Sequence, residues 1–142
     1  MSSTAIRQLS AKVATDLLVH KGSGFATFGL PRPLQESDPT THALLQKSKV
    51  FYSPRTWLRD LGYYPDVVYE IHLSVHPDLQ GMGYAAKMVR ALAVEMGKPL
   101  WIMKARIINP KVLSIVEKLK HDPLVTVQGI EYEGSLQGWV VR

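Results

Sequence analysis

One stretch of this chain, between residues 67 and 96, constrains the fold most because it reads as a strand, a glycine turn and a helix in succession. The strand VVYEIHLSV is rich in β-branched and aromatic residues, and Pro77 stops it because proline donates no ladder hydrogen bond. Gly81 and Gly83 then permit a tight turn with exposed backbone amides. Beyond the turn, Lys87 and Arg90 are predicted to lie on the polar side of a helix. Its apolar side is formed by Ala85, Met88, Val89, Leu92 and Met96.

This arrangement predicts an anion-binding site at the turn. A strand that enters a helix through a glycine turn directs several unpaired N–H groups toward one point. The positive end of the helix dipole faces the same point, which favours a phosphate group. We therefore expect the ligand at residues 80–85.

Two known sequence patterns fit the turn. The segment GMGYAA reads as the dinucleotide pattern G-x-G-x-x-A, which also needs an acidic residue about 20 positions later. Residues 100–105 are LWIMKA and contain no acid, which argues against this interpretation. The second pattern, Q/R-x-x-G-x-G/A, is met by Gln80, Gly83 and Ala85. Through this pattern the chain resembles the GNAT superfamily of acyl-CoA-dependent N-acyltransferases.

The resemblance covers roughly residues 66 to 120 and implies a fold and a cofactor. We expect an α/β (α+β) chain that forms a single GNAT-like domain over residues 1–142. Its mixed central sheet would be flanked by helices and would end in a C-terminal antiparallel hairpin. In this family the matched turn cradles the pyrophosphate of coenzyme A, so acetyl-CoA is the expected cofactor. The residues that the resemblance assigns to coenzyme A are Leu73, Ser74, Val75, Gln80, Gly81, Met82, Gly83, Tyr84, Ala85 and Asn109.

LWIMKA reads as the next strand, and the helix that follows it departs from the family at two places. One is the end of the helix, where Lys120 and His121 stand in place of the usual Gly-Phe. Asn109 and Lys118 fall into register with the pattern N-x-x-A-x-x-L-Y-x-K of many GNAT chains. Val116 occupies the place where many members carry the tyrosine that protonates the departing thiolate. The candidate substitutes for this acid are Ser114, Tyr63 and Tyr64.

Two residues of the central strand are candidate catalytic bases. Glu70 and His72 share one face of the strand, and a carboxylate in a mainly apolar strand is costly unless it is paired or lies in a cleft. Many GNAT members place a glutamate near here to accept the amine proton, and histidine titrates in the range useful for a base. The alternatives are a structural or solvent-facing carboxylate and a hydrogen-bonded sheet histidine. His76 shares the same face, but no third ligand has a suitable spacing, so no metal site is expected.

Composition excludes some chemistry and leaves other options open. The chain contains no cysteine, which rules out disulfides and a cysteine acyl-enzyme. Its net charge of +5 suits polyanionic coenzyme A, and it is also compatible with nucleic acid or an ordinary solvated surface. Neither a signal-peptide core nor an apolar run long enough for a membrane span is found, so a cytoplasmic protein without membrane contacts is expected.

The leading hypothesis is an N-acetyltransferase that moves an acetyl or related acyl group from coenzyme A to an amine by direct attack. The acceptor amine would belong to a small molecule or a protein, and a homodimer is left open. Two alternatives remain: a non-catalytic acyl-CoA-binding or protein interaction module, and a nucleic-acid interaction module on the same fold.

The remaining pattern predicts elements on both sides of this stretch. We expect a helix from Thr4 to His20, a strand at residues 25–30 and a loop from Arg32 to Thr40. Further helices are expected at 41–50 and from Ser53-Pro54 to Leu61. Strands at 124–132 and 136–142 would flank a hairpin turn at 133–135. This leaves one early strand where GNAT chains usually have three.

Overall fold

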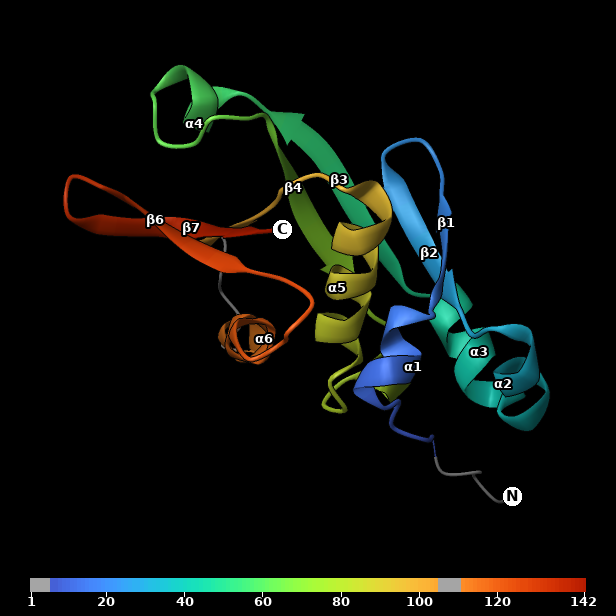
Figure 1. Cartoon of the computed structure of the whole chain (residues 1–142). Coiled ribbons are helices and arrows are strands. Elements are labelled where there is room, and N and C mark those ends of the chain that lie inside the picture. Colours follow the sequence, from blue (N-terminus) through green and yellow to red (C-terminus); the bar gives the residue numbers. More distant parts are fainter. Residues whose placement is uncertain (1–5, 105–110) are drawn as a thin grey trace. The chain divides into compact units, whose positions relative to one another are not determined.

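The computed structural model describes residues 6–104 and 111–142, and its strands form a mixed sheet (Figure 1). Hydrogen bonds link the seven strands of these residues in the order β1-β2-β3-β4-β5-β7-β6. The strands are β1 (Leu18–Lys21), β2 (Phe25–Gly29), β3 (Lys49–Arg55), β4 (Val68–Ser74), β5 (Leu100–Met103), β6 (Val127–Tyr132) and β7 (Ser135–Val141). The helices are α1 (Ala11–Thr15), α2 (Arg32–Ser37), α3 (Pro39–Gln46), α4 (Trp57–Asp60), the short 3₁₀ helix η1 (Pro77–Leu79), α5 (Tyr84–Met96) and α6 (Lys111–Lys120).

The pairing of the strands confirms the predicted mixed α/β class. Strands β4 and β5 run parallel, and helix α5 connects them as a crossover. The pairs β1·β2, β2·β3, β5·β7 and β6·β7 are antiparallel. In the described part of the chain no helix is long and apolar enough to cross a membrane.

The chain divides into two compact units. Unit 1 consists of Met1–Phe51 and Leu73–Leu92, and unit 2 consists of Tyr52–His72 and Ala93–Arg142. Strands β3 and β4 and helix α5 contribute residues to both units. The single domain over residues 1–142 stays a prediction.

The N-terminal part of unit 1 corrects the predicted helix from Thr4 to His20. The helix covers only Ala11–Thr15, and the Ser10 side chain caps it by accepting a 3.3 Å hydrogen bond from the Val13 N–H. The chain then enters β1, which pairs with β2 from Leu18↔Gly29 to Lys21↔Ala26. The backbone hydrogen-bonding groups of β1 therefore have partners on β2. This pairing decides the local structure, although the apolar residues are spaced as in a helix.

The predicted loop from Arg32 to Thr40 is also wrong, because it forms helices α2 and α3. Each helix has a proline in its first turn, where the missing N–H costs no internal hydrogen bond. Asp38 caps α3 by accepting a 3.2 Å hydrogen bond from the Thr41 N–H. The prolines that suggested a loop therefore start helices.

Strand β3 replaces the beginning of the helix predicted from Ser53-Pro54. Both residues lie inside β3, and the helix that follows, α4, is limited to Trp57–Asp60. The helix predicted over 41–50 ends at Gln46 in α3, and β3 begins at Lys49. Three strands therefore precede β4, whereas the sequence pattern indicated one.

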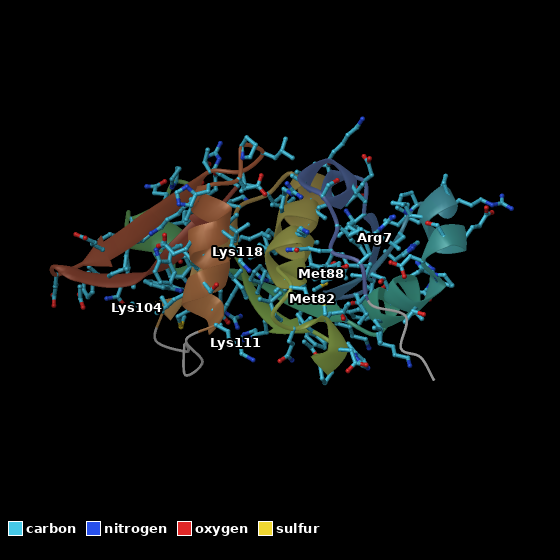
Figure 2. The ribbon with its side chains drawn as sticks, turned by 90° about the horizontal axis from the view of Figure 1, so that it is seen from below. Arg7, Met82, Met88, Lys104, Lys111 and Lys118 are labelled. Atoms are coloured by element: carbon cyan, nitrogen blue, oxygen red, sulfur yellow. The ribbon has the colours of Figure 1, made fainter. Side chains whose placement is uncertain are left out.

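From β4 onward the observed elements confirm the predicted order of strand, helix, strand, helix, strand and strand. Met82 lies in the turn before α5, and Met88 lies on α5 itself, where it is fully buried (Figure 2). At the predicted C-terminal hairpin, Glu133 and Gly134 adopt φ angles of 51° and 78° between the paired residues Tyr132 and Ser135. Two successive left-handed residues are typical of a tight hairpin turn.

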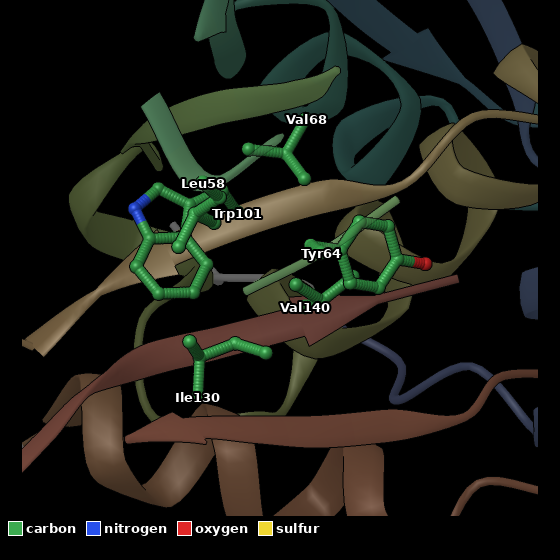
Figure 3. Close-up of a cluster of buried hydrophobic side chains, with 6 residues drawn as sticks. All are labelled: Leu58, Tyr64, Val68, Trp101, Ile130 and Val140. Atoms are coloured by element: carbon green, nitrogen blue, oxygen red, sulfur yellow. The ribbon is translucent and has the colours of Figure 1, made fainter. Parts of the chain in front are cut away.

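The core of unit 2 is a cluster of six buried side chains: Leu58, Tyr64, Val68, Trp101, Ile130 and Val140 (Figure 3). Trp101 is fully buried, and the Trp57 ring packs edge-on against it at a centroid distance of 5.9 Å. Gly138 on β7 makes room for this tryptophan, because a Cβ atom there would collide with the Ile102 carbonyl and the Trp101 ring.

Candidate functional site

In the turn between β4 and α5, both glycines adopt the left-handed backbone conformation of a tight turn. Gly81 and Gly83 have φ angles of 82° and 83°, a left-handed conformation that glycine adopts at little cost. A Cβ atom built at Gly81 would meet no atom within 4 Å, so the space beside this residue is open. A ligand can therefore approach the backbone closely at Gly81.

The amides of the turn are available to a ligand. Within the described residues, no backbone carbonyl accepts a well-formed hydrogen bond from the N–H groups of residues 81 to 85. Helix α5 begins at Tyr84, so these groups include the first amides of the helix, which have no partner within it. Several consecutive N–H groups next to a helix N-terminus form a seat for an anion.

Gln80 forms two hydrogen bonds with the residues before the turn. Its backbone N–H donates to the Pro77 carbonyl at 3.2 Å. Its side-chain Nε2 donates to the Val75 carbonyl at 3.1 Å, and the side chain lies at the surface. Gln80 therefore braces the turn against the end of the strand.

The N-terminal segment of unit 1, residues 8–11, forms hydrogen bonds with the turn and with α5. Gln8 Nε2 donates to the Met82 carbonyl at 2.9 Å, and Lys87 Nζ donates to the Leu9 carbonyl. Arg90 Nη2 donates to the Ala11 carbonyl at 3.0 Å. The exposed fraction of Arg90 is only 2%, so the prediction that it lies on the polar side of the helix is wrong. Its guanidinium is a structural contact to the N-terminal segment.

The coenzyme residues predicted on the strand, Leu73, Ser74 and Val75, lie at the end of β4. Leu73 and Val75 are half-buried and Ser74 is exposed. Just beyond them, the His76 N–H donates to the buried hydroxyl of Ser48 at 3.0 Å. This hydrogen bond fixes the place where the chain leaves the strand.

The parallel ladder between β4 and β5 stops early. In the described residues the two strands pair only at Tyr69↔Leu100 and Glu70↔Trp101, although β5 continues to Met103. From Ile71 onward, β4 is therefore no longer paired with β5.

Glu70 is buried within unit 2 and has two partners. Its exposed fraction is 1%, and its Oε2 accepts from Arg55 Nη2 at 3.1 Å and lies 3.2 Å from His72 Nε2. The second oxygen, Oε1, is buried and has no hydrogen-bond partner in the described residues. A buried carboxylate oxygen without a donor is costly, so this oxygen favours a donor group brought by a water or a ligand.

His72 is the accessible member of the pair, because 45% of its side chain is exposed. When neutral, it can donate its Nε2 proton to Glu70, which leaves Nδ1 as the acceptor. The structure thus brings together both predicted catalytic residues and adds Arg55, whose side chain is 41% exposed. Sequence reasoning missed Arg55 because it lies 15 residues from Glu70, in a segment predicted to be helical.

The candidate acids occupy different environments. Tyr64 belongs to the buried cluster, and its hydroxyl accepts a 3.0 Å hydrogen bond from Arg142 Nη1. Tyr63 packs edge-on against Tyr132, and partial burial, followed by the charges of Tyr132 and Glu133, raises the pKa of Tyr63. Ser114 is exposed on α6, whereas Val116 is buried, with an exposed fraction of 1%. The predicted coenzyme residue Asn109 lies outside the described residues.

His76 has a structural role just beyond the end of β4. His76 Nδ1 accepts a 3.2 Å hydrogen bond from the Asp78 N–H and thereby caps η1. Across residues 6–104 and 111–142, no group of three or more histidine, aspartate and glutamate side chains could hold a metal ion.

Comparison with known proteins gives one structural similarity. No protein-family model matches the chain, and no curated protein does. Among solved structures, the chain is similar to a Bordetella pertussis protein that is provisionally named a GnaT-family acetyltransferase, with a TM-score of 0.45 and 20% identity. The similarity covers 83% of this chain and 64% of that chain, so this chain spans less than two thirds of that protein's length. The fold itself, a seven-stranded mixed sheet with flanking helices in the described residues, is consistent with the GNAT-like fold that the sequence resemblance implies.

Proposed function

We propose that this protein transfers an acetyl or related acyl group from coenzyme A to an amine by direct attack. The observation that carries this proposal is the turn at residues 81–85. Two left-handed glycines there leave consecutive N–H groups without a backbone hydrogen bond of good geometry in the described residues. These groups would hold the diphosphate of coenzyme A, because amides at a helix N-terminus bind phosphate oxygens well.

The end of the pairing between β4 and β5 supports a binding site for the pantetheine arm of the coenzyme on β4. A strand that leaves its ladder exposes backbone N–H and C=O groups that need other partners. Leu73, Ser74 and Val75 come after Glu70, the last residue of β4 that pairs with β5, so backbone groups on that side would bind the amides of the pantetheine arm. Pairing of this kind gives affinity without requiring particular side chains.

The reaction needs a proton acceptor, and His72 is assigned this role. Acyl-coenzyme A, when bound, would supply the thioester whose carbonyl carbon the amine attacks. A C–N bond forms, the C–S bond breaks, and the amine loses one proton while the departing sulfur gains one. His72 would accept the amine proton at Nδ1, while Glu70 holds Nε2 and orients the ring.

Tyr63 stays a candidate proton donor because its side chain is only half-buried. Burial, followed by the charges of Tyr132 and Glu133, raises the pKa of Tyr63 and makes its phenol a weaker acid than an ordinary tyrosine. Tyr64 is less suited because its side chain is buried and its hydroxyl already accepts from Arg142. A hydroxyl on α6 is available only at Ser114, which is exposed.

A specific observation favours a second candidate, a binding module without turnover. Val116 stands where the family resemblance places the catalytic tyrosine, and it is part of the buried core. An apolar side chain at this position can neither donate a proton nor reach a thiolate. The chain would then bind acyl-CoA and use it as a structural or regulatory ligand.

Two measurements test the leading proposal. Thermal unfolding with and without acetyl-CoA measures binding, since a ligand at 100 times its dissociation constant stabilises by about 2.7 kcal/mol. Release of free thiol is then followed while a panel of small-molecule and protein amines is supplied. If acetyl-CoA raises the unfolding temperature and at least one amine causes thiol release, the enzyme is supported. If acetyl-CoA raises the unfolding temperature but no amine in the panel causes thiol release, the binding module is supported. No stabilisation contradicts both.

The remaining expectations belong to the same proposal. The acceptor is an amine on a small molecule or a protein, and the protein works in the cytoplasm. A nucleic-acid module rests on the net charge of +5 alone. Affinity for RNA or DNA that falls steeply with salt would favour that module over the enzyme.

A further inference from the structure

Arg55 and His72 share one partner in unit 2, the Oε2 oxygen of Glu70. Arg55 Nη2 donates to this oxygen at 3.1 Å, and His72 Nε2 lies 3.2 Å from it. The two nitrogens are therefore no farther apart than the sum of these two distances. A permanent cation thus lies beside the histidine that is assigned as the base.

The guanidinium of Arg55 uses only part of its hydrogen-bonding capacity. Besides its bond to Glu70, Arg55 donates from Nη1 to the Pro54 carbonyl at 3.4 Å, which is longer than a typical N–H···O hydrogen bond. A guanidinium carries five N–H donors, and Arg55 forms no further hydrogen bond within the described residues. Since 41% of the side chain is exposed, a ligand from solvent can reach it.

His72 also keeps a hydrogen-bonding atom for a ligand. Within residues 6–104 and 111–142, its one hydrogen-bond partner is Glu70, which its Nε2 faces. A neutral ring that donates from Nε2 has an unprotonated Nδ1, and 45% of this side chain is exposed. One ligand can therefore place its amine at Nδ1 and a second group at Arg55.

The chemistry of arginine indicates what the second group is. The planar fork of a guanidinium matches a carboxylate, with which it forms two parallel N–H···O bonds. A phosphate carries nearly two negative charges, and Arg55 already balances the buried charge of Glu70. A second anion with a single charge is repelled less, so Arg55 favours a carboxylate.

The short separation of Arg55 and His72 limits the length of the ligand. Hydrogen bonds to the two side chains each span about 3 Å, which leaves only a few bonds between the amine and the carboxylate. An α-amino acid carries both groups on one carbon and fits this separation. An amine with a distant carboxylate would have to fold back on itself.

We propose that the acceptor is a free amino acid, whose carboxylate binds Arg55 while its amine lies at His72 Nδ1. Arg55 is then the residue that determines acceptor specificity, and Glu70 Oε2 fixes the positions of both side chains. This inference rests on the proposed function and narrows its acceptor. An arginine that served only to neutralise Glu70 would not distinguish an amino acid from an amine without a carboxylate.

The experiment measures thiol release from acetyl-CoA with the proteinogenic amino acids, each compared with its carboxamide. The carboxamide keeps the amine and the side chain but lacks the negative charge, as does the first residue of a protein. For the best amino acid, the wild-type protein should show a kcat/KM at least about tenfold above that of its carboxamide, the effect of one charge-assisted pair.

Two variants test the assignment to Arg55. Arg55→Lys keeps a positive charge beside Glu70 but loses the fork, so the preference for the amino acid should fall several-fold, mainly through a higher KM. Arg59→Lys, at an exposed ion pair on α4, should keep the wild-type preference.

The outcomes separate this inference from the proposed function. Thiol release with amino acids and carboxamides at similar kcat/KM would overturn the inference and leave the acyltransferase intact, and this wild-type comparison does not depend on the folding of any variant. An undiminished preference in folded Arg55→Lys would also overturn it. If no amine caused thiol release from acetyl-CoA, the proposed function would fail and the inference with it.

Discussion

Glu70 and His72 stand two residues apart on β4 and are joined by a 3.2 Å hydrogen bond, yet Glu70 is buried and His72 is nearly half exposed. A buried carboxylate cannot easily reach an incoming amine, but it can hold the ring of a histidine that does. In the proposed reaction, Glu70 would orient the imidazole ring and His72 would act as the accessible base.

Replacement of His72 by glutamine should lower kcat by about 100- to 10,000-fold, because the general base is lost. Glu70→Gln should have a smaller effect, since the amide still reaches His72 but no longer fixes its tautomer. Steady-state thiol release over a range of pH values measures both. The matched control is His20→Gln, a substitution of an exposed histidine on β1. Full activity in His72→Gln would contradict the role of His72 as the base.

Arg55 should contribute to stability through Glu70. Arg55→Met leaves a buried carboxylate with His72 as its remaining partner, which should lower the free energy of unfolding by about 1–2 kcal/mol after allowance for the partial exposure of the arginine. Urea unfolding at neutral pH measures this. Arg59→Met removes an exposed ion pair to Asp60 and should cost less than about 0.5 kcal/mol. Equal stability of the two variants would contradict this reading of Arg55.

Gly138 should be irreplaceable in the core of unit 2. Gly138→Ala forces a methyl group against the Ile102 carbonyl and the Trp101 ring, and overpacking of this kind costs about 1–3 kcal/mol. Gly129→Ala on β6 is the control, because its nearest neighbour is the flexible end of Leu136 at 3.2 Å. Chemical denaturation should show a large loss for the first variant and a small one for the second. A reversed order would contradict the packing described for Trp101.

Tyr84 should make the protein less stable at alkaline pH. Its pKa is raised in the folded state, mainly by burial and then by Asp38, so the folded protein keeps a proton that the unfolded chain loses. The stability that Tyr84 contributes is thus complete below the usual tyrosine pKa of about 10 and is lost as pH rises above it. Urea midpoints measured between neutral and strongly alkaline pH should fall less steeply in Tyr84→Phe than in Tyr132→Phe. Identical slopes would contradict the burial of the Tyr84 hydroxyl.

Local sequence chemistry was sufficient to predict the elements from β4 to β7. The turn at Gly81 and Gly83, the crossover helix and the hairpin at Glu133-Gly134 all depend on backbone preferences of their own residues. Glu70 and His72 were also predictable as neighbours, because alternate residues of a strand share a face.

The first third of the chain could not be predicted in the same way, because tertiary pairing decides it. Leu18 lies in a segment with helical spacing, but its backbone pairs with Gly29 of β2. Arg90 was expected on the exposed side of α5 because of its charge, yet it is buried and donates to the Ala11 carbonyl. Arg55 forms an ion pair with Glu70 because the fold brings together two residues that are 15 positions apart. Each of these contacts joins residues far apart in sequence, which local patterns do not encode.

The account depends most on the turn at residues 81–85, and a pair of glycine variants tests it directly. Gly81 and Gly62 have φ angles of 82° and 81°, and a Cβ atom at either one meets nothing within 4 Å. Alanine at either position therefore carries the same backbone strain, roughly 1 kcal/mol, but only Gly81 adjoins the proposed diphosphate seat.

Calorimetric titration of coenzyme A into the wild-type protein, Gly81→Ala and Gly62→Ala is the decisive measurement. The account predicts that the wild-type protein and Gly62→Ala bind with the same affinity, and that Gly81→Ala binds at least about tenfold more weakly. No binding to the wild-type protein, or equal affinity in all three, would contradict it.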